Sequence, residues 1–306
     1  RQNAYHGSTI ASASLGGFGF VHQQFETLPY VEHIVDPNWF VNGGDLSSEE
    51  FGLQAARALE EKIDEIGEDN IAAFIAEPIQ GAGGVIVPPD SYWPEVSRIL
   101  KARDILFISD EVICGFGRTG ELFGSQTLGT EPDLITFAKA VTNGFQPLGG
   151  VLVSDKIASV ITAKGGEFAH GFTYSGHPIA CAAAMATLDI MQSENIFERV
   201  RDHAAPYMQK RWAELGEHPI VGHTRGLGMF GSLELVRNKQ TRERLAPDQV
   251  SGGICRDIAL ENGLVMRAVG DSMIISPPLI CTDGEIDMLI ERATQALDKT
   301  AEQFSV

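Results

Sequence analysis

The sequence predicts an α/β fold, a mostly parallel sheet flanked by helices, followed by a smaller C-terminal α+β domain. Two compact apolar runs, residues 71–76 and 105–109, are predicted as buried strands, and the pattern between them predicts a helix at residues 92–103. A strand, a helix and a second strand in this order are typical of a parallel sheet. Beyond residue 190 short strands and helices alternate, so we place a large domain at residues 1–190 and a small domain at residues 191–306.

The other elements of the large domain follow from local patterns. Small residues after the Gly- and Ser-rich start predict a helix through residues 11–15, and helical spacing of apolar residues behind a Ser-rich cap predicts another at 53–66. The apolar run that begins after Asp133 is predicted as a strand that delivers Lys139 to its end, just before an Asn-Gly turn. The remaining elements expected here are a strand at 149–153 and helices at 155–162 and 178–191.

The small domain is expected to mix short strands with helices. Its predicted elements are a helix at 197–212, a strand at 228–235, a helix at 252–261, strands at 264–266 and 273–275, and a helix at 285–304. The chain has no internal repeat that would indicate a solenoid.

Composition excludes several classes of function. With a formal net charge of −18, the 306-residue chain lacks the Lys/Arg excess with which proteins bind nucleic acids or anionic membranes. The longest apolar stretches, such as residues 179–188, are too short to span a bilayer. The four cysteines are far apart and form no Cys-x-x-Cys pair, which predicts free thiols in a reducing compartment, here the cytoplasm, and no metal site. The eight histidines contain no His-Glu-x-x-His, so a metal hydrolase is disfavoured.

Opposite charges follow two of the predicted strands. Asp110 comes directly after the strand at 105–109, and Lys139 ends the strand that begins after Asp133. The carboxyl ends of strands are where open α/β sheets bind ligands. We expect this lysine to be poorly placed for solvent, and desolvation lowers the pKa of an amine, so that it can attack a carbonyl to form a Schiff base. Alone, each residue has a plain alternative, an N-cap or salt bridge for Asp110 and a solvated side chain for Lys139.

Pyridoxal phosphate is the cofactor whose chemistry unites this pair. A lysine forms a Schiff base with its aldehyde, and a carboxylate keeps its ring nitrogen protonated so that the ring accepts electrons. Asp110 and Lys139 suit these two roles.

Over essentially its whole length the sequence resembles the class III (omega) aminotransferases, pyridoxal phosphate enzymes of fold type I, and within them the amine:pyruvate branch. Five motifs in order carry the resemblance. They are Ala-Tyr-His-Gly-Ser-Thr at 4–9, Glu-Pro-Ile-Gln-Gly-Ala-Gly-Gly at 77–84, Asp-Glu-Val-Ile-Cys-Gly-Phe-Gly-Arg-Thr-Gly at 110–120, Phe-Ala-Lys at 137–139 and His-Gly-Phe-Thr-Tyr-Ser-Gly-His-Pro at 170–178.

The resemblance implies how the cofactor ring would be held. Tyr5 would pack on one face of the ring and Val112 on the other, Asp110 would contact the ring nitrogen, and Lys139 would form the internal Schiff base. His6, the neighbour of Tyr5 in its motif, is placed among the cofactor-binding residues. Without the motif, Tyr5 and Val112 would be taken as core residues.

Two further cofactor contacts are implied by the family. Glu77 would lie near the lysine and a cofactor oxygen, and Thr173 would reach the cofactor phosphate of the neighbouring subunit. The resemblance therefore implies a homodimer with shared active sites, with a tetramer as a further possibility. The phosphate-binding Ser/Gly loop of the family lies upstream of Arg1, and we expect the sequence to be an incomplete view of the protein.

The substrate side is also implied by the resemblance. Arg267, ahead of a Ser-Pro-Pro segment, matches the mobile arginine that pairs with the pyruvate carboxylate, although a solvated arginine is a serious alternative. Ile113 resembles the amine:pyruvate enzymes, since ornithine- and 4-aminobutyrate-type members tend to carry glutamine there. Phe20 aligns with an aromatic wall of the substrate pocket. Arg225 is expected to be structural.

The function implied is transamination between a primary amine or omega-amino acid and a keto acid, most simply pyruvate. Diamines, β-alanine, taurine and 4-aminobutyrate all stay open as donors. A degenerate, non-catalytic aminotransferase-like module is the alternative outside enzymes. Residues 115–120 also satisfy Gly-x-Gly-x-x-Gly, but a dinucleotide site is disfavoured because the motif does not open a helix directly after the strand.

Overall fold

The computed structural model describes residues 1–246 and 250–306, which group into two compact units. The large unit comprises Arg1–Ile79, Pro88–Gly117 and Glu121–Phe197, and the small unit comprises Gln80–Val87, Arg118–Gly120 and Glu198–Val306. We expected a single boundary near residue 190 and did not anticipate that two short segments, 80–87 and 118–120, would group with the C-terminal part.

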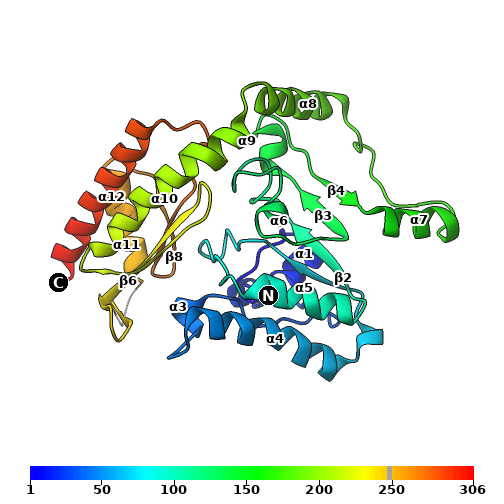
Figure 1. Ribbon diagram of the computed structural model, residues 1–306, viewed down its shortest axis with the longest axis horizontal. Helices are drawn as coiled ribbons and strands as arrows, with labels where there is room; N and C mark the ends of the chain where they lie inside the picture. The colour runs from blue at the N-terminus through cyan, green and yellow to red at the C-terminus, as the bar shows by residue number, and fades with distance from the viewer. Residues whose placement is uncertain (247–249) are drawn as a thin grey trace. The chain divides into compact units, whose positions relative to one another are not determined.

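The large unit is built on a mixed four-stranded sheet (Figure 1). Its strands lie in the order β1 (Ala73–Ala76), β2 (Leu106–Asp110), β3 (Leu134–Phe137) and β4 (Gly150–Val153). The first three are parallel, and β4 runs antiparallel to β3. The α/β class predicted from the strand–helix–strand order is therefore confirmed, with one antiparallel strand at the edge.

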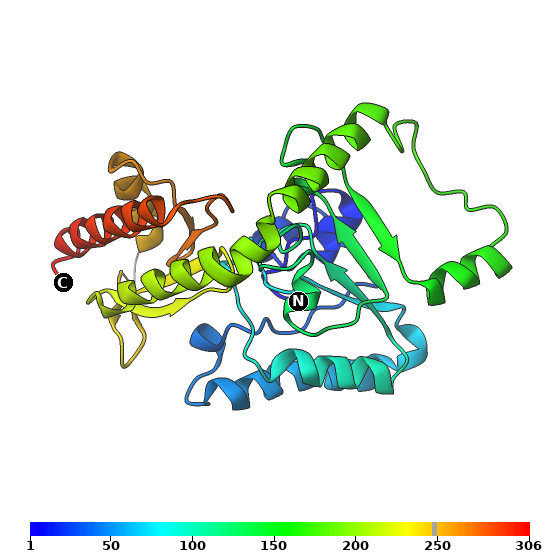
Figure 2. The ribbon, with the colours of Figure 1, turned by 45° about the horizontal axis from the view of Figure 1, so that its top comes forward.

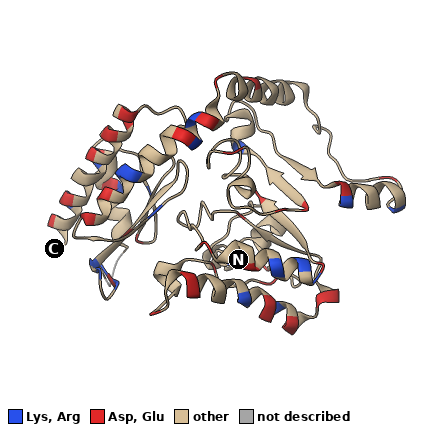
Figure 3. Cartoon of the chain, in the orientation of Figure 1, with Lys and Arg blue, Asp and Glu red and all other residues tan. Residues whose placement is uncertain are grey.

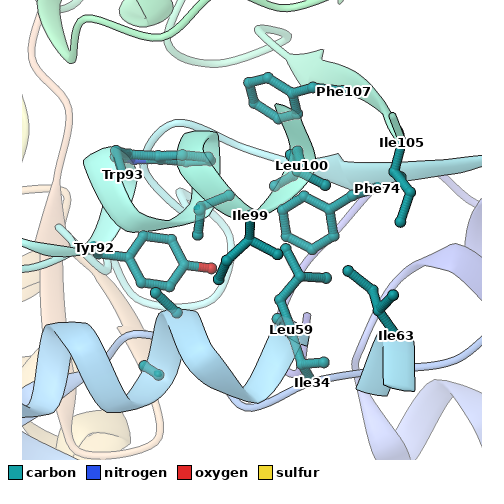
Figure 4. Close-up of a cluster of buried hydrophobic side chains, with 14 of the residues drawn as sticks. Ile34, Leu59, Ile63, Phe74, Tyr92, Trp93, Ile99, Leu100, Ile105 and Phe107 are labelled. Carbon is teal, nitrogen blue, oxygen red and sulfur yellow. The ribbon is translucent and has the colours of Figure 1, made fainter. Parts of the chain in front are cut away.

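Two helices and two strands enclose the core of the large unit (Figure 4). Helix α4 (Ser48–Ile66) begins at a capping box, in which Ser47 and Glu50 satisfy each other's backbone N–H groups, and it packs against α5 (Tyr92–Ala102). Phe74 of β1 and Phe107 of β2 are paired in register, with their ring centroids 6.3 Å apart. Burial of these apolar side chains fixes the two strands whose ends carry the candidate site.

Short helices and turns make up the rest of the large unit. They are α1 (Ile10–Leu15), α2 (Gly19–His22), α3 (Trp39–Asn42), η1 (Glu68–Asn70), α6 (Gly124–Thr127), η2 (Lys139–Thr142), α7 (Asp155–Lys164) and α8 (Pro178–Ser193). Helices α7 and α8 agree with the helices predicted at 155–162 and 178–191.

The small unit is a sheet with helices packed against it. The strand order is β5 (Val221–Arg225), β6 (Gly231–Asn238), β9 (Ser272–Ile275) and β8 (Arg267–Val269), with β7 (Glu243–Arg244) also paired to β6, and every pairing is antiparallel. Its helical segments are η3 (Val200–Ala204), α10 (Ala205–Glu214), η4 (Leu215–Glu217), α11 (Ser251–Glu261) and α12 (Asp283–Gln303), and α9 (Ile196–Arg199) leads into it. Figures 1 and 2 show α10 and α12 side by side.

One expectation for the small unit is wrong, and one of its strands was not predicted. The strand predicted at 264–266 is absent from that position, because pairing with β9 starts only at Arg267; the alternation that resembled a strand comes from buried Leu264 and Met266 on either side of exposed Val265. The polar strand β5 was not predicted, because it offers no apolar alternation. The helix predicted at 197–212 is a helical run whose middle, η3, is a π-helix.

The excess of acidic residues and the separated cysteines of the sequence can be followed in the structure. Acidic residues lie along α4 and α12 (Figure 3). Over residues 1–246 and 250–306, no helix is long and apolar enough to cross a membrane, all four cysteines are free, and no three His, Cys, Asp or Glu side chains gather as they would around a metal ion.

Candidate active site

The candidate site lies at the carboxyl ends of neighbouring parallel strands. Asp110 is the last residue of β2 and stands opposite Thr136 of β3, and β3 ends at Phe137, just before Lys139. Glu77 follows directly after the last residue of β1. Parallel strand order therefore brings two carboxylates and one amine to the same edge of the sheet.

Asp110 is held in one orientation by two hydrogen bonds. Its Oδ2 accepts from Nδ1 of His6 at 2.7 Å, and its Oδ1 accepts from the backbone N–H of Val112 at 3.1 Å. The aspartate is 5% exposed. Across the described residues, Nε2 of His6 is buried without a hydrogen-bond partner. His6, which the motif only associated with the cofactor, is thus a direct support of Asp110.

Glu77 is a buried carboxylate behind the same strand ends. It is 3% exposed, and its Oε1 accepts from the backbone N–H of Tyr5 at 3.1 Å. Burial raises the pKa of Glu77 above its ordinary value, nearby Asp110 adds to the rise, and His6 and Arg1 oppose it. The surroundings of Glu77 therefore favour the protonated, uncharged form of its carboxyl group.

Glu111 is a third buried acid at these strand ends, and no role was predicted for it from the sequence. Its two carboxylate oxygens accept from the backbone N–H groups of Gly124 at 2.8 Å and Ser125 at 2.7 Å, and from Oγ of Ser109 at 3.2 Å. A Cβ at Gly124 would lie 2.8 Å from Cβ of Cys114, so only glycine allows this approach. Glu111 thereby fixes the loop that follows Asp110. In the sequence, its position next to Asp110 was the one feature that could have indicated this role.

Lys139 differs from the buried acids, and one expectation about it is wrong. We expected a lysine shielded from solvent, but its side chain is exposed, because β3 ends at Phe137 and Lys139 opens the short helix η2. Its φ of +48° lies in the left-handed region that is unfavourable for residues with a Cβ. Non-glycine residues in this region occur often at functional sites.

An open pocket of about 1050 Å³ extends from Lys139. Its lining residues come from η2, from the loop before β4 and from the loop that leads into α8. They are Ala138, Lys139, Thr142, Gly144, Gln146, Pro147, Leu148, Gly149, Phe172, Tyr174, Ser175, Gly176, His177 and Ala180. Thr173 is exposed within the last of these loops.

A short series of aromatic rings leads away from Tyr5. The ring centroid of Phe18 lies 6.3 Å from that of Tyr5 and 5.3 Å from that of Phe20. Tyr5 is 40% exposed and Phe20 is 63% exposed. Phe18, which was missed, connects the two predicted aromatic residues; the Phe-Gly-Phe spacing around Gly19 was its only signal in the sequence.

The remaining predicted residues lie in different surroundings. Val112 and Ile113 are half-buried in the loop after β2. Arg267 is exposed at the start of β8 in the small unit, and within the described part of the chain no hydrogen bond or ion pair is assigned to its side chain. Direct hydrogen bonds thus join Tyr5 to Glu77 and Asp110 to both His6 and Val112, while Phe20, Thr173 and Arg267 have no such link to them.

Chemically, this arrangement can hold a flat cationic ring and present an amine to a carbonyl carbon. A fixed, buried carboxylate stabilises a protonated ring nitrogen. An exposed lysine beside an open pocket can reach a bound carbonyl compound.

Comparison with known proteins places these observations in a wider context. Residues 1–297 match the family model described as aminotransferase class-III. The putrescine–pyruvate aminotransferase of Pseudomonas aeruginosa is 58% identical over 302 residues, which cover 98% of this chain and 66% of that protein. The mitochondrial gamma aminobutyrate transaminase 1 of Solanum lycopersicum is 42% identical over 305 residues, covering 98% of this chain and 59% of that protein.

Solved structures of transaminases are similar to this chain in fold and in sequence. The (S)-enantioselective omega-transaminase from Thermomicrobium roseum superposes with a TM-score of 0.92 at 42% identity, covering 98% of this chain and 67% of that chain. A structure described as a transaminase with L-ala gives a TM-score of 0.94 at 40% identity, covering 99% of this chain and 72% of that chain. The chain thus spans about two thirds or less of the curated relatives it matches.

Proposed function

This chain belongs to the class III aminotransferases, because that family's model matches residues 1–297, and from this premise we propose that it transfers an amino group from a primary amine to pyruvate with pyridoxal 5'-phosphate as cofactor. The observation that carries the proposal is the fixed carboxylate of Asp110, supported by His6 and Val112, on the strand next to the one that leads to Lys139. The 58% identity to a putrescine–pyruvate aminotransferase favours pyruvate as the acceptor and a diamine as the donor.

The residues present fit this cofactor. A carboxylate whose two oxygens are already oriented by Nδ1 of His6 and the backbone N–H of Val112 suits a protonated pyridine nitrogen. Tyr5 and Val112 are the residues we assign to the two faces of the ring. In finer terms, we assign the mixed sheet of the large unit to fold type I.

When bound, pyridoxal phosphate supplies an aldehyde that combines with amines and a ring that accepts the electrons of a breaking C–H bond. Asp110 holds the proton on the ring nitrogen, and His6 keeps Asp110 oriented. Nζ of Lys139 takes the proton from the amine-bearing carbon of the donor and delivers a proton to the former keto carbon of the acceptor. Lys139 is among the residues that line the open pocket.

Substrates are recognised by residues around these groups. Glu77, whose pKa is raised by burial, positions substrate and cofactor oxygens. Phe20 and Ile113 line the donor side, and the exposed guanidinium of Arg267 pairs with the pyruvate carboxylate in bidentate fashion. An arginine without an internal partner can turn away when a donor without a carboxylate binds.

We further propose that the active form is a homodimer. Thr173 is exposed in a loop that also carries the exposed aromatic side chains of Phe172 and Tyr174. Large exposed apolar side chains gathered at one place are typical of a surface that binds another molecule, and we assign this one to a second copy of the chain. In the dimer, Thr173 of one copy contacts the cofactor phosphate bound by the other.

A second donor class rests on a separate observation. Relatives described as gamma aminobutyrate transaminases are 41–43% identical to this chain. Ile113, in place of the glutamine typical of 4-aminobutyrate enzymes, favours the amine:pyruvate assignment over this alternative.

A donor screen tests the proposal. The complete protein is incubated with pyridoxal phosphate, pyruvate and each of putrescine, an aryl-alkyl amine, β-alanine, taurine and 4-aminobutyrate, and alanine formation is measured. We expect alanine with putrescine. Alanine with 4-aminobutyrate alone would move the protein to the second class, and no alanine with any donor would contradict transamination and favour a non-catalytic module.

A further inference from the structure

Arg225 forms a buried ion pair on one face of the small sheet. Its side chain, at the end of β5, is 7% exposed, and its Nη1 donates to Oε1 of Glu234 at 2.5 Å. The same oxygen of Glu234 accepts from Oγ of Ser272 at 2.8 Å. The carboxylate thereby fixes the orientation of the guanidinium.

The rest of the guanidinium holds a strained turn in the segment 80–87. Nε of Arg225 donates to the carbonyl of Val85 at 2.8 Å, and Nη2 donates to the carbonyl of Gly84 at 2.7 Å. Val85 has a φ of +49°, which is a genuine outlier for a β-branched residue. Such a conformation persists only where the surroundings over-determine it. The two hydrogen bonds from Arg225 are part of that determination.

Arg225 and Arg267 occupy a single row across the small sheet. Arg225 stands opposite Ser232, Ser232 opposite Ile274, and Ile274 opposite Arg267. Three strand spacings separate the ends of this row, roughly 14 Å. The segment that follows Glu77 and the arginine assigned to the pyruvate carboxylate are therefore parts of the same compact unit.

We infer that Arg225 is a positioning residue: it holds the chain that follows Glu77 to the sheet that carries Arg267, and so sets where Arg267 meets a carboxylate substrate. The inference rests on the proposed function for the role of Arg267. A lysine in place of Arg225 keeps the charge beside Glu234 but has no planar fork to reach two carbonyls at once.

Arg118 offers a matched control. It also lies in the small unit, donates from Nη1 to the carbonyls of Met229 at 3.0 Å and Pro277 at 2.5 Å, and sits 5.6 Å from the ring centroid of Phe230. Arg118→Lys removes an arginine of similar structural importance, but it leaves the 80–87 turn and its arginine in place.

The experiment compares Arg225→Lys with Arg118→Lys in the complete protein by two readouts. Hydrogen exchange without cofactor should show about tenfold faster exchange of amides in residues 80–87 for Arg225→Lys only. With cofactor, Arg225→Lys should raise KM for pyruvate about tenfold while KM for putrescine stays near the wild-type value. Arg118→Lys should change neither KM.

Each outcome decides the inference. Unchanged exchange in residues 80–87 would overturn the anchoring, and equal changes in both KM values, or in neither, would overturn the positioning of Arg267. If the wild type transferred no amino group, the proposed function would fail, while the exchange measurement would still test the anchor. If Arg225→Lys did not fold, Glu234→Gln would replace it, with a smaller rise in exchange and in KM for pyruvate expected in the same direction.

Discussion

The acid side and the lysine side of the candidate site are built in opposite ways. On the acid side, Glu77, Asp110 and Glu111 are almost fully buried, and each has a carboxylate oxygen that accepts from a named donor of the same unit. On the lysine side, Lys139 is exposed and opens onto a pocket lined by exposed loops. The contrast teaches that packing within one unit buries and orients the acids, whereas the lysine proposed to meet a substrate stays accessible to solvent.

The largest effect on kcat is expected at Lys139, the residue that we propose transfers the proton. Lys139→Ala removes the proton-carrying amine and should lower kcat for alanine formation by about a thousandfold or more. Steady-state kinetics with putrescine and pyruvate measure it. Lys156→Ala, at an exposed lysine of α7, is the control and should leave kcat unchanged. Normal turnover by Lys139→Ala would contradict the proposed role of Lys139 in proton transfer.

Asp110→Asn should have the next largest effect, because it keeps the shape of the side chain but removes the charge that His6 and Val112 orient. We expect kcat to fall by about a hundredfold. Asp133→Asn is the matched control: its carboxylate also accepts from a backbone N–H, that of Phe107 at 2.9 Å, but it directly precedes β3, at the opposite end of this strand from Lys139. Equal losses in both variants would mean that the acid side is only structural.

Glu77→Gln tests the burial of Glu77 through the pH dependence of the free energy of unfolding. Because burial raises the folded-state pKa of Glu77 above 4.5, the folded chain binds this proton more tightly than the unfolded chain. Its favourable contribution is complete below pH 4.5 and is lost as pH rises through the raised pKa. Wild-type stability should therefore fall relative to Glu77→Gln over that window, by at most about 1.4 kcal/mol per pH unit. Urea unfolding at a series of pH values measures this difference, and a flat difference would contradict it.

The smallest effect on the chain itself is expected on the lysine side. Phe172 is 76% exposed, so Phe172→Ala should change the free energy of unfolding of a single chain by no more than about 0.5 kcal/mol. If a second copy covers this loop, however, the variant should dissociate at higher protein concentration in analytical ultracentrifugation. Tyr30→Ala, at a side chain that is 77% exposed elsewhere, should leave dissociation unchanged. Identical behaviour of the two variants would argue against a dimer through this loop.

The sequence predicted the acid side better than the lysine side. Compact apolar runs ending in acids place Glu77 and Asp110 at strand ends, because a buried parallel strand has a distinct composition. The role of His6 could not be predicted, since its contact with Asp110 spans 104 residues and depends on tertiary packing. Glu111 was missed for a similar reason: its partners, Gly124 and Ser125, become donors only when the loop folds back.

The exposure of Lys139 could not be deduced either. An apolar run before a lysine indicates a strand but not the residue at which the strand stops, and element ends are uncertain by a few residues in any such prediction. In the small unit, the same uncertainty explains why the strand predicted at 264–266 is found at Arg267–Val269. Strand β5 was not predicted because most of its residues, including Arg225, are polar. The functional roles of all the predicted site residues, including Lys139, Asp110, Arg267 and Thr173, stay predictions.

The left-handed backbone of Lys139 separates two kinds of selection at one position. Glycine adopts a φ of +48° without strain, whereas a residue with a Cβ loses about 1 kcal/mol there, so folding and chemistry favour different amino acids. Under the proposed function, lysine is retained here only while transamination is useful to the organism. Among descendants of such a protein that have taken up other duties, this codon should be among the first to drift, and a glycine or asparagine in its place would mark a lineage that has abandoned catalysis.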